Sequence, residues 1–318
     1  MAHSTASSPL STTVSLSTAL LLTAAIWAFA ANSILCRLAL AGGYIDALTF
    51  TSVRLVSGAV VLTFVLFAKS SRPVIAIDPL ATLALVVYAL AFSISYVGLQ
   101  AGVGALLLFG AVQVTMLSVG LVRGERLSYR AWFGFALAVM GLITYLLPGN
   151  KSAPMPAVGS MLIAGCAWGV YSLRGAYGQD PVAATASNFL AAVPITLALA
   201  FVFSNGWHVT SQGIVWAALS GAVTSGLGYV LWYHVVKKIP AFTAATVQLG
   251  VPIFAALGGV VILGEPLTMR LAFASITVLG GIALVVKGRQ SSVTSASAST
   301  IGRTESALRE QWIHGAGI

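Results

Sequence analysis

The sequence predicts an all-α integral membrane protein whose ten transmembrane helices form two inverted five-helix repeats. Of its 318 residues, 58% are hydrophobic and only 7% are charged, which leaves too little polar surface for a water-soluble domain. Ten apolar runs are each long enough to cross a bilayer core of ~30 Å, which takes roughly 20 helical residues. A short phrase and a mid-helix tryptophan recur once in each half of the chain.

The ten runs lie between charges, Pro or Gly residues and polar clusters. Their predicted limits are 16–40, 47–68, 79–99, 103–122, 129–147, 157–177, 182–203, 213–236, 241–263 and 269–287. The connections are too short to fold as separate domains. Because the runs are continuously apolar rather than alternating, they exclude a transmembrane β-barrel.

The repeated phrase divides the ten runs into two halves. Gly-Glu-x-Leu-Ser/Thr-x-Arg occurs at 124–130 and again at 264–270, before the last run of each half. The first run of each half carries a central tryptophan, Trp27 or Trp168. Since five crossings is an odd number, the second copy must enter the membrane upside down. Inverted repeats are typical of secondary transporters, whose substrate site lies near the midplane between the repeats.

We therefore predict a cytosolic N-terminal tail at 1–15, repeats at 16–150 and 151–288, and a disordered, Ser/Thr/Ala-rich cytosolic tail at 289–318. With this topology, twelve of the sixteen Lys and Arg residues are cytosolic, three are on the outer side and Arg54 lies within a run. This bias is the positive-inside pattern of a multi-pass cell (inner) membrane protein. It explains the net charge of +9 without a nucleic-acid partner. Residues 1–13 lack Lys and Arg and the first run is long, which argues against a cleaved signal peptide.

The repeated phrase has the composition of a tight connector between helices. Its glycines suit the left-handed conformation that ends a helix, and Ser128 and Thr268 suit the N-cap of the next helix. Each glutamate is expected to pair with the arginine that follows it, Arg130 or Arg270, or to accept backbone N–H groups in the turn. The predicted structural connector residues are Gly124, Glu125, Gly264 and Glu265.

The chain resembles the EamA-type permeases of the drug/metabolite transporter superfamily over roughly residues 16–287. The resemblance rests on "GERL" and "GEPL", on "SVRLVSGAV" (52–60) and on "VVKKIPAFTAATVQLGVPIFAALGGVVILGEPL" (235–267), which contains Pro252. In departures from the family pattern, Trp27 precedes Ala28 rather than glycine, and Val112 is the first-half counterpart of Pro252. The resemblance implies export or facilitated exchange of small metabolites, amino acids among them.

Arg54 is the strongest candidate for a functional residue. It lies about two helical turns inside its run, where a cation costs roughly 2.5–3.5 kcal/mol to insert. It therefore either faces a cavity, where it would suit a carboxylate or phosphate, or holds backbone carbonyls or lipid headgroups. The position at the same depth in the second half falls near Asn188.

Other candidates are aromatic or uncharged polar residues within the runs, which line a substrate path or else satisfy helix packing. We expect Pro252 to kink the ninth helix beside Gln248. Tyr96, Trp232, Tyr233 and His234 lie near run ends, as in an interfacial aromatic belt. The predicted substrate-binding or translocation residues are Trp27, Asn32, Arg54, Gln113, Trp168, Tyr171, Tyr229 and Gln248.

Several chemistries find no support in the sequence. No Asp or Glu lies deep in a run, so a carboxylate proton relay has no carrier. There is no ATP-binding P-loop and no metal-binding pattern, so we expect no cofactor and no enzyme activity. Cys36 and Cys166 lie at different depths, which argues against a disulfide.

The leading prediction is thus a secondary-type transporter, an exporter or facilitator of small metabolites that works by alternating access in the lipid bilayer. A non-transporting assembly or sensor protein is the alternative. A membrane-embedded transferase would need acidic groups that these loops lack. The sequence leaves open whether two copies form a homodimer.

Overall fold

The computed structural model describes residues 16–69, 75–124, 128–146, 154–175, 180–203, 208–237, 239 and 247–288. Those residues are almost entirely helical, and Ile45 and Val209 form the one isolated bridge among them. The helices of the first half are α1 (Leu16–Ala41), α2 (Ala47–Lys69), α3 (Pro79–Tyr96), α4 (Ala101–Val122) and α5 (Tyr129–Leu146).

The second half has the same number of crossings, but two of them are irregular. Its elements are α6 (Met155–Gly175), α7 (Pro181–Phe203), α8 (Ser211–Leu219), the π-helical segment η1 (Ser220–Leu227), α9 (Gly228–Val236), α11 (Gly250–Leu263) and a final helix, Met269–Gly288. The elements α8, η1 and α9 are continuous and together make one crossing. The ninth crossing is interrupted at Leu249, three residues before Pro252, whose ring nitrogen cannot donate a helical hydrogen bond.

Eight helices in the described part of the chain are long and apolar enough to cross a membrane. The helix α11 has only 14 residues, and α5 has 18. The predicted runs agree with the observed helices to within three residues at each end, apart from the interrupted ninth. The prediction of an all-helical, multi-pass membrane protein is therefore confirmed.

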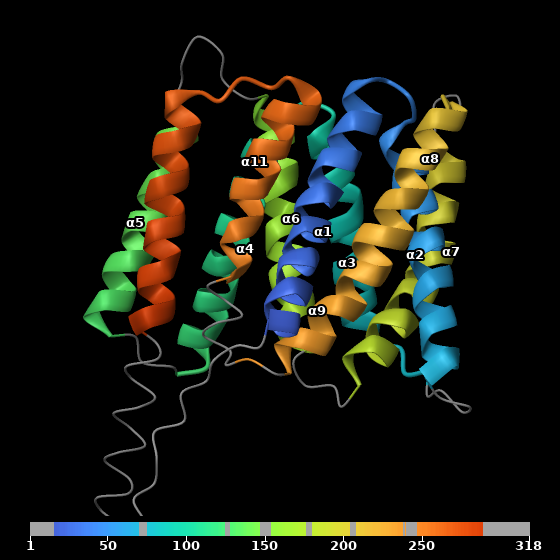
Figure 1. Ribbon diagram of the computed structural model, residues 1–318, viewed down its shortest axis with the longest axis horizontal. Coiled ribbons are helices and arrows are strands. Elements are labelled where there is room, and N and C mark those ends of the chain that lie inside the picture. Colours follow the sequence, from blue (N-terminus) through green and yellow to red (C-terminus); the bar gives the residue numbers. More distant parts are fainter. Residues whose placement is uncertain are drawn as a thin grey trace, which may run out of the picture.

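The two halves are packed into each other rather than side by side (Figure 1). The first helix of the first half, α1, lies against η1, α9 and α11, which belong to the second half. The first helix of the second half, α6, lies against α3 and α4. The second helices, α2 and α7, pack along each other. The centre of the bundle is therefore built from both halves.

Small residues set the closest approaches between helices. Gly165 and Gly169 lie one turn apart on α6, and a Cβ at Gly165 would be 2.7 Å from the carbonyl oxygen of Leu108 on α4. A Cβ at Gly169 would likewise lie 2.9 Å from the Thr115 side chain, so the two glycines let α6 and α4 approach closely. At the edge of the bundle, α5 and the final helix form a pair (Figure 1), and Gly134 faces Gly281 at their contact.

The bundle has two ends, which we call the Glu265 face and the Asp78 face. The Glu265 face, uppermost in Figure 1, carries the α1–α2, α3–α4 and α11–final helix connections. The Asp78 face carries both ends of the described chain, Leu16 and Gly288.

The connectors of the repeated phrase begin with glycines of positive φ, +85° at Gly124 and +65° at Gly264. Other residues avoid this conformation, which lets the chain leave the preceding helix sharply. As predicted, Ser128 and Thr268 accept from the amides of Ala131 and Leu271 and so cap the next helices. Glu125, like the tails 1–15 and 289–318, lies outside the described residues.

Candidate functional site

Arg54 of α2 is sealed inside the bundle, with 1% of its surface exposed. Its Nε donates to the Ser225 hydroxyl at 3.3 Å, and its Nη2 donates to the Tyr88 hydroxyl at 3.1 Å. The guanidinium carbon lies 5.3 Å from the centre of the Tyr88 ring and 5.0 Å from that of Phe92. Its Nη1 is buried and has no hydrogen-bond partner among the described residues. Arg54 is thus held by neutral groups, and no carboxylate pairs with it there.

The π-helical segment η1 supplies hydroxyl groups to two helices of the first half. Ser220 and Thr224 donate to the side-chain oxygen of Asn32 on α1, at 2.7 and 3.2 Å. Ser225, one residue further, accepts from Arg54 on α2. Short π-helical segments inside α-helices are frequent at functional sites. Here the segment joins Asn32 and Arg54 into one buried polar cluster.

An aromatic cluster continues from the guanidinium towards the second half. Tyr88 lies 4.7 Å from Trp168, ring centre to ring centre. Trp168 stacks on Tyr229 at 5.6 Å and 17° and on Tyr171 at 5.3 Å and 29°. Both of these tyrosines are buried. The buried cluster therefore places a cation beside several aromatic rings.

Of the predicted substrate residues, the structure brings together Asn32, Arg54, Trp168, Tyr171 and Tyr229. The remaining three lie elsewhere or form no contact with this group. Trp27 is 45% exposed, and its ring centre lies 4.6 Å from that of Phe254 of α11, with the ring planes tilted by 38°. Gln113 and Gln248 are half-buried, on α4 and beside the break at Leu249. The central tryptophans of the two halves, Trp27 and Trp168, therefore have different surroundings.

Three comparisons with known proteins bear on this arrangement. Residues 155–287 match the EamA-like transporter family. An uncharacterized protein of Pseudomonas aeruginosa is 48% identical over 277 residues, which is 86% of this chain and 95% of the relative. A relative from Archaeoglobus fulgidus described as an uncharacterized transporter is 26% identical, over 64% of this chain and 74% of the relative.

The chain belongs to the EamA-like transporter family. A solved crystal structure of 19% identity has the same fold, with a TM-score of 0.60 over 86% of this chain and 98% of that one. The resemblance in the sequence is thus confirmed, and the Arg54 cluster lies inside an EamA-type membrane transporter.

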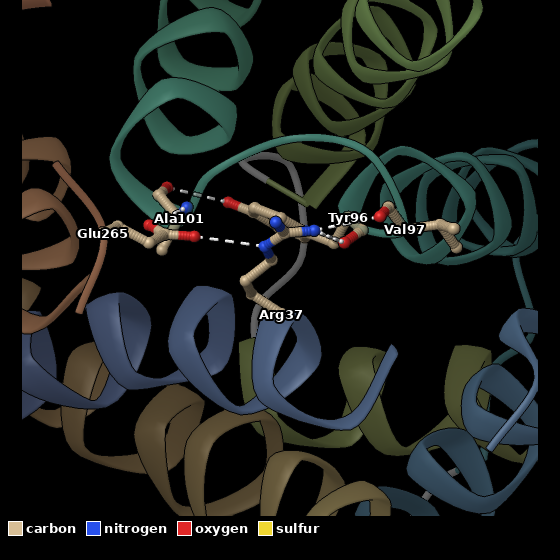
Figure 2. A network of polar contacts seen from close by, with 5 residues as sticks. All are labelled: Arg37, Tyr96, Val97, Ala101 and Glu265. Carbon is tan, nitrogen blue, oxygen red and sulfur yellow. Dashed lines mark hydrogen bonds and ion pairs between the residues drawn. The ribbon is translucent and has the colours of Figure 1, made fainter. Parts of the chain in front are cut away.

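At the Glu265 face of this EamA-type protein, one ion pair fastens four segments (Figure 2). Arg37 Nε lies 3.1 Å from Glu265 Oε1, and Arg37 Nη1 donates to the carbonyls of Tyr96 and Val97, at 3.0 and 2.9 Å. Glu265 Oε2 accepts from the amide of Ala101 at 2.8 Å. The network therefore joins α1, the end of α3, the start of α4 and the connector after α11.

Two expectations for these residues are wrong. Glu265 neither pairs with Arg270 nor accepts amides of its own turn, because Arg37 and Ala101 take both its oxygens. Arg270 instead donates to the carbonyl of Thr144. Tyr96 is not an interfacial residue, since it is fully buried and its hydroxyl donates to the Ala101 carbonyl.

The Asp78 face of the EamA-type bundle carries two exposed ion pairs. Lys69 Nζ lies 3.0 Å from Asp180 Oδ2, and Arg174 Nη2 lies 2.7 Å from Asp78 Oδ2. Partial burial raises the pKa of each carboxyl, but backbone amides and the paired cation outweigh it and hold both pKa values below the usual range. Each aspartate also caps the helix that follows it.

Sequence reasoning missed Tyr88, Ser225 and Arg37. Tyr88 lies at the middle of a predicted run, where its hydroxyl requires a partner. Its position in the sequence could therefore have identified it as a candidate. Ser225 gives no such signal, because it reaches Arg54 only through the π-helical segment. Asn188, at the depth that matches Arg54, instead accepts from the Asp78 amide and the Thr82 hydroxyl, and so has a structural role.

Proposed function

We propose that this chain is a secondary-type transporter, an exporter or facilitator, that carries small metabolites such as amino acids across the cell membrane by alternating access. The observation that carries the proposal is the sealed Arg54 guanidinium, with one unpartnered nitrogen, beside the Trp168 aromatic cluster. A buried cation without a carboxylate is costly. Its retention is explained if a substrate supplies the missing acceptor.

The burial of this site supports the proposed alternating access. Because Arg54 is 1% exposed, no solute can reach it until helices separate. The helices around it come from both halves, α2 and α3 from the first and α6 and η1 from the second. Movement of one half against the other would therefore open the site.

The packing supports an inverted-repeat arrangement. Each half places its first helix against the third and fourth crossings of the other half, and the two second helices contact each other. The residues that cap the second helix of each half lie at opposite faces of the bundle. Asp46 caps α2 at the Glu265 face, and Asp180 caps α7 at the Asp78 face. An exchange of the two halves would convert one set of contacts into the other.

The ion pairs of the described residues fit a mechanism in which the two faces open in turn. All three pairs join a residue of the first half to one of the second. One lies at the Glu265 face and two lie at the Asp78 face, so each face has its own cross-half contacts. By the positive-inside rule we propose that the Asp78 face, with Lys69 and Arg174, is cytosolic.

Transport can be tested directly in proteoliposomes. The full chain is reconstituted, radiolabelled amino acids and small organic acids are loaded in turn, and efflux is compared with protein-free vesicles. We expect Arg54→Gln to abolish the protein-dependent flux and the exposed control Arg130→Gln to retain it. If no compound leaves faster than from protein-free vesicles, the proposed function is wrong.

A further inference from the structure

We infer that Arg54, Tyr88 and Ser225 together bind the anionic group of the substrate, and that this substrate is an organic monoanion with an apolar or aromatic body. The inference rests on the proposed function and deepens it. It adds two binding residues to the site and selects among the classes of metabolite that the transporter could carry.

The three side chains offer hydrogen-bond donors in excess of acceptors. Arg54 Nη1 has no partner among the described residues. The Tyr88 and Ser225 hydroxyl oxygens both accept from Arg54, so each keeps an O–H hydrogen to donate. Neither hydroxyl donates to another group in the described part of the chain. At least three N–H or O–H donors around this guanidinium thus lack an acceptor among the described residues.

A site of this kind selects a group that only accepts hydrogen bonds. An ionised carboxylate fits, because both its oxygens accept and it carries no donor. An ammonium group placed here would bring a second positive charge and no acceptor, and an amide would bring an acceptor oxygen but no negative charge.

The charge around Arg54 limits the charge of the ligand. Among the described acidic side chains, Glu265, Asp180 and Asp78 lie at the two faces in pairs with Arg37, Lys69 and Arg174, and Asp46 caps α2 at the Glu265 face. The buried cluster therefore carries one positive charge, which a monoanion neutralises. A phosphate monoester, at about −1.5 to −2, would leave a buried negative charge without a partner. This favours a carboxylate over a phosphate ester.

The surroundings of the donors favour an apolar body on the same molecule. Tyr88 presents its hydroxyl to Arg54 and its ring to Trp168, at 4.7 Å between ring centres. An anion held by the hydroxyl therefore has its remaining atoms beside the stacked rings of Trp168, Tyr171 and Tyr229. Arg54 and Tyr88 belong to the first half and Ser225 to the second, so such a ligand would also bridge the halves.

Binding to the purified full chain tests the inference separately from transport. The probes are monocarboxylates with phenyl, indole and branched aliphatic bodies, namely 3-phenylpropionate, indole-3-acetate and 4-methylpentanoate. Each is compared with its uncharged primary amide, and phenyl phosphate is the dianionic probe. Affinity is measured from ligand-dependent tryptophan fluorescence and thermal stabilisation.

We expect at least one carboxylate to bind, and its amide and phenyl phosphate to bind at least tenfold more weakly. Ser225→Ala and Tyr88→Phe should each weaken carboxylate binding about tenfold, as loss of a donor to a charged group predicts. Neither variant should alter the weak binding of the amide. Ser187→Ala and Tyr145→Phe, which remove hydroxyls elsewhere, are matched controls and should bind like the wild type.

The inference is overturned if no carboxylate in the panel binds, if the amides bind as tightly as the acids, or if folded Ser225→Ala and Tyr88→Phe proteins retain wild-type affinity. Should vesicles still transport metabolites in any of these cases, the proposed function stands and only the substrate class is wrong. If carboxylates bind but no compound is transported, the inferred binding site stands and the proposed transport function is wrong.

Discussion

The carboxylate of Glu265 accepts from Arg37 with one oxygen and from the Ala101 amide with the other. One side chain in the connector after α11 thus fastens the end of α1 to the start of α4. The two ionised side chains are 20% and 12% exposed, so the pair is better shielded from water than those of the Asp78 face. Shielding from water strengthens charge–charge attraction. This ion pair should therefore hold the Glu265 face together more strongly than either ion pair holds the Asp78 face.

Glu265→Gln should loosen the Glu265 face. The variant keeps the side-chain length but loses the charge that holds Arg37, so α1 and α4 should separate more often. Buried Cys36 then serves as a reporter in a Cys166→Ala background. We expect a membrane-impermeant maleimide added at the Glu265 face to modify Cys36 several-fold faster than in the parent. Equal rates in folded proteins would mean that the pair does not control access.

The stability contributed by the two ion pairs of the Asp78 face should change with pH only in acidic solution. The pKa values of Asp78 and Asp180 are held below their usual range. A lowered carboxyl pKa contributes stability that is fully present above the unfolded value of about 4 and is lost as pH falls through the folded value. The difference in melting temperature between the wild type and Asp78→Asn/Asp180→Asn should therefore be constant from pH 7 to 5 and shrink below pH 4. A difference that shrinks between pH 7 and 5 would contradict this assignment.

Arg54→Met should separate stability from function. Replacement of the buried guanidinium by an apolar side chain of similar length removes a charge that no described carboxylate offsets, and with it the cost of burying that charge. We therefore expect an unchanged or higher melting temperature for the ligand-free protein, together with loss of transport. A marked fall in melting temperature would indicate that Arg54 mainly supports the fold.

The pairing of α5 with the final helix can be tested at two adjacent glycines. A Cβ at Gly281 would lie 2.5 Å from the backbone oxygen of Gly134 and 2.6 Å from the amide nitrogen of Ala138, whereas one at Gly280 meets nothing within 4 Å. Backbone atoms cannot rotate away, so Gly281→Ala should destabilise the protein by about 1–3 kcal/mol. Gly280→Ala should be neutral or mildly stabilising. Similar melting temperatures for the two variants would argue against the close approach.

Helix positions were predictable here because a bilayer imposes length and apolar composition on every crossing. Arg54, Trp168, Tyr171 and Tyr229 were also predictable, since a polar or aromatic group deep in lipid requires a partner. The identity of each partner was not, because it depends on how distant helices pack. Glu265 is the clear example. Its nearest cation in sequence is Arg270, but helix packing brings Arg37 to it instead.

The π-helical segment was not predictable for a related reason. Its serines, threonine and glycines are compatible with an ordinary membrane helix, and only contacts with Asn32 and Arg54 distinguish it. The difference between Trp27 and Trp168 likewise arises from neighbours, Phe254 in one case and three tyrosines in the other.

The π-helical segment also makes the two halves unequal. The third crossing of the second half has 26 residues, Ser211–Val236, whereas its counterpart α3 has 18. Under the proposed alternating-access mechanism, the two end states would therefore be unequal in structure and should differ in free energy. If the proposed mechanism holds, the affinity for substrate and the rates of binding and release should then differ between the two sides of the membrane, although net flux stops when no gradient remains.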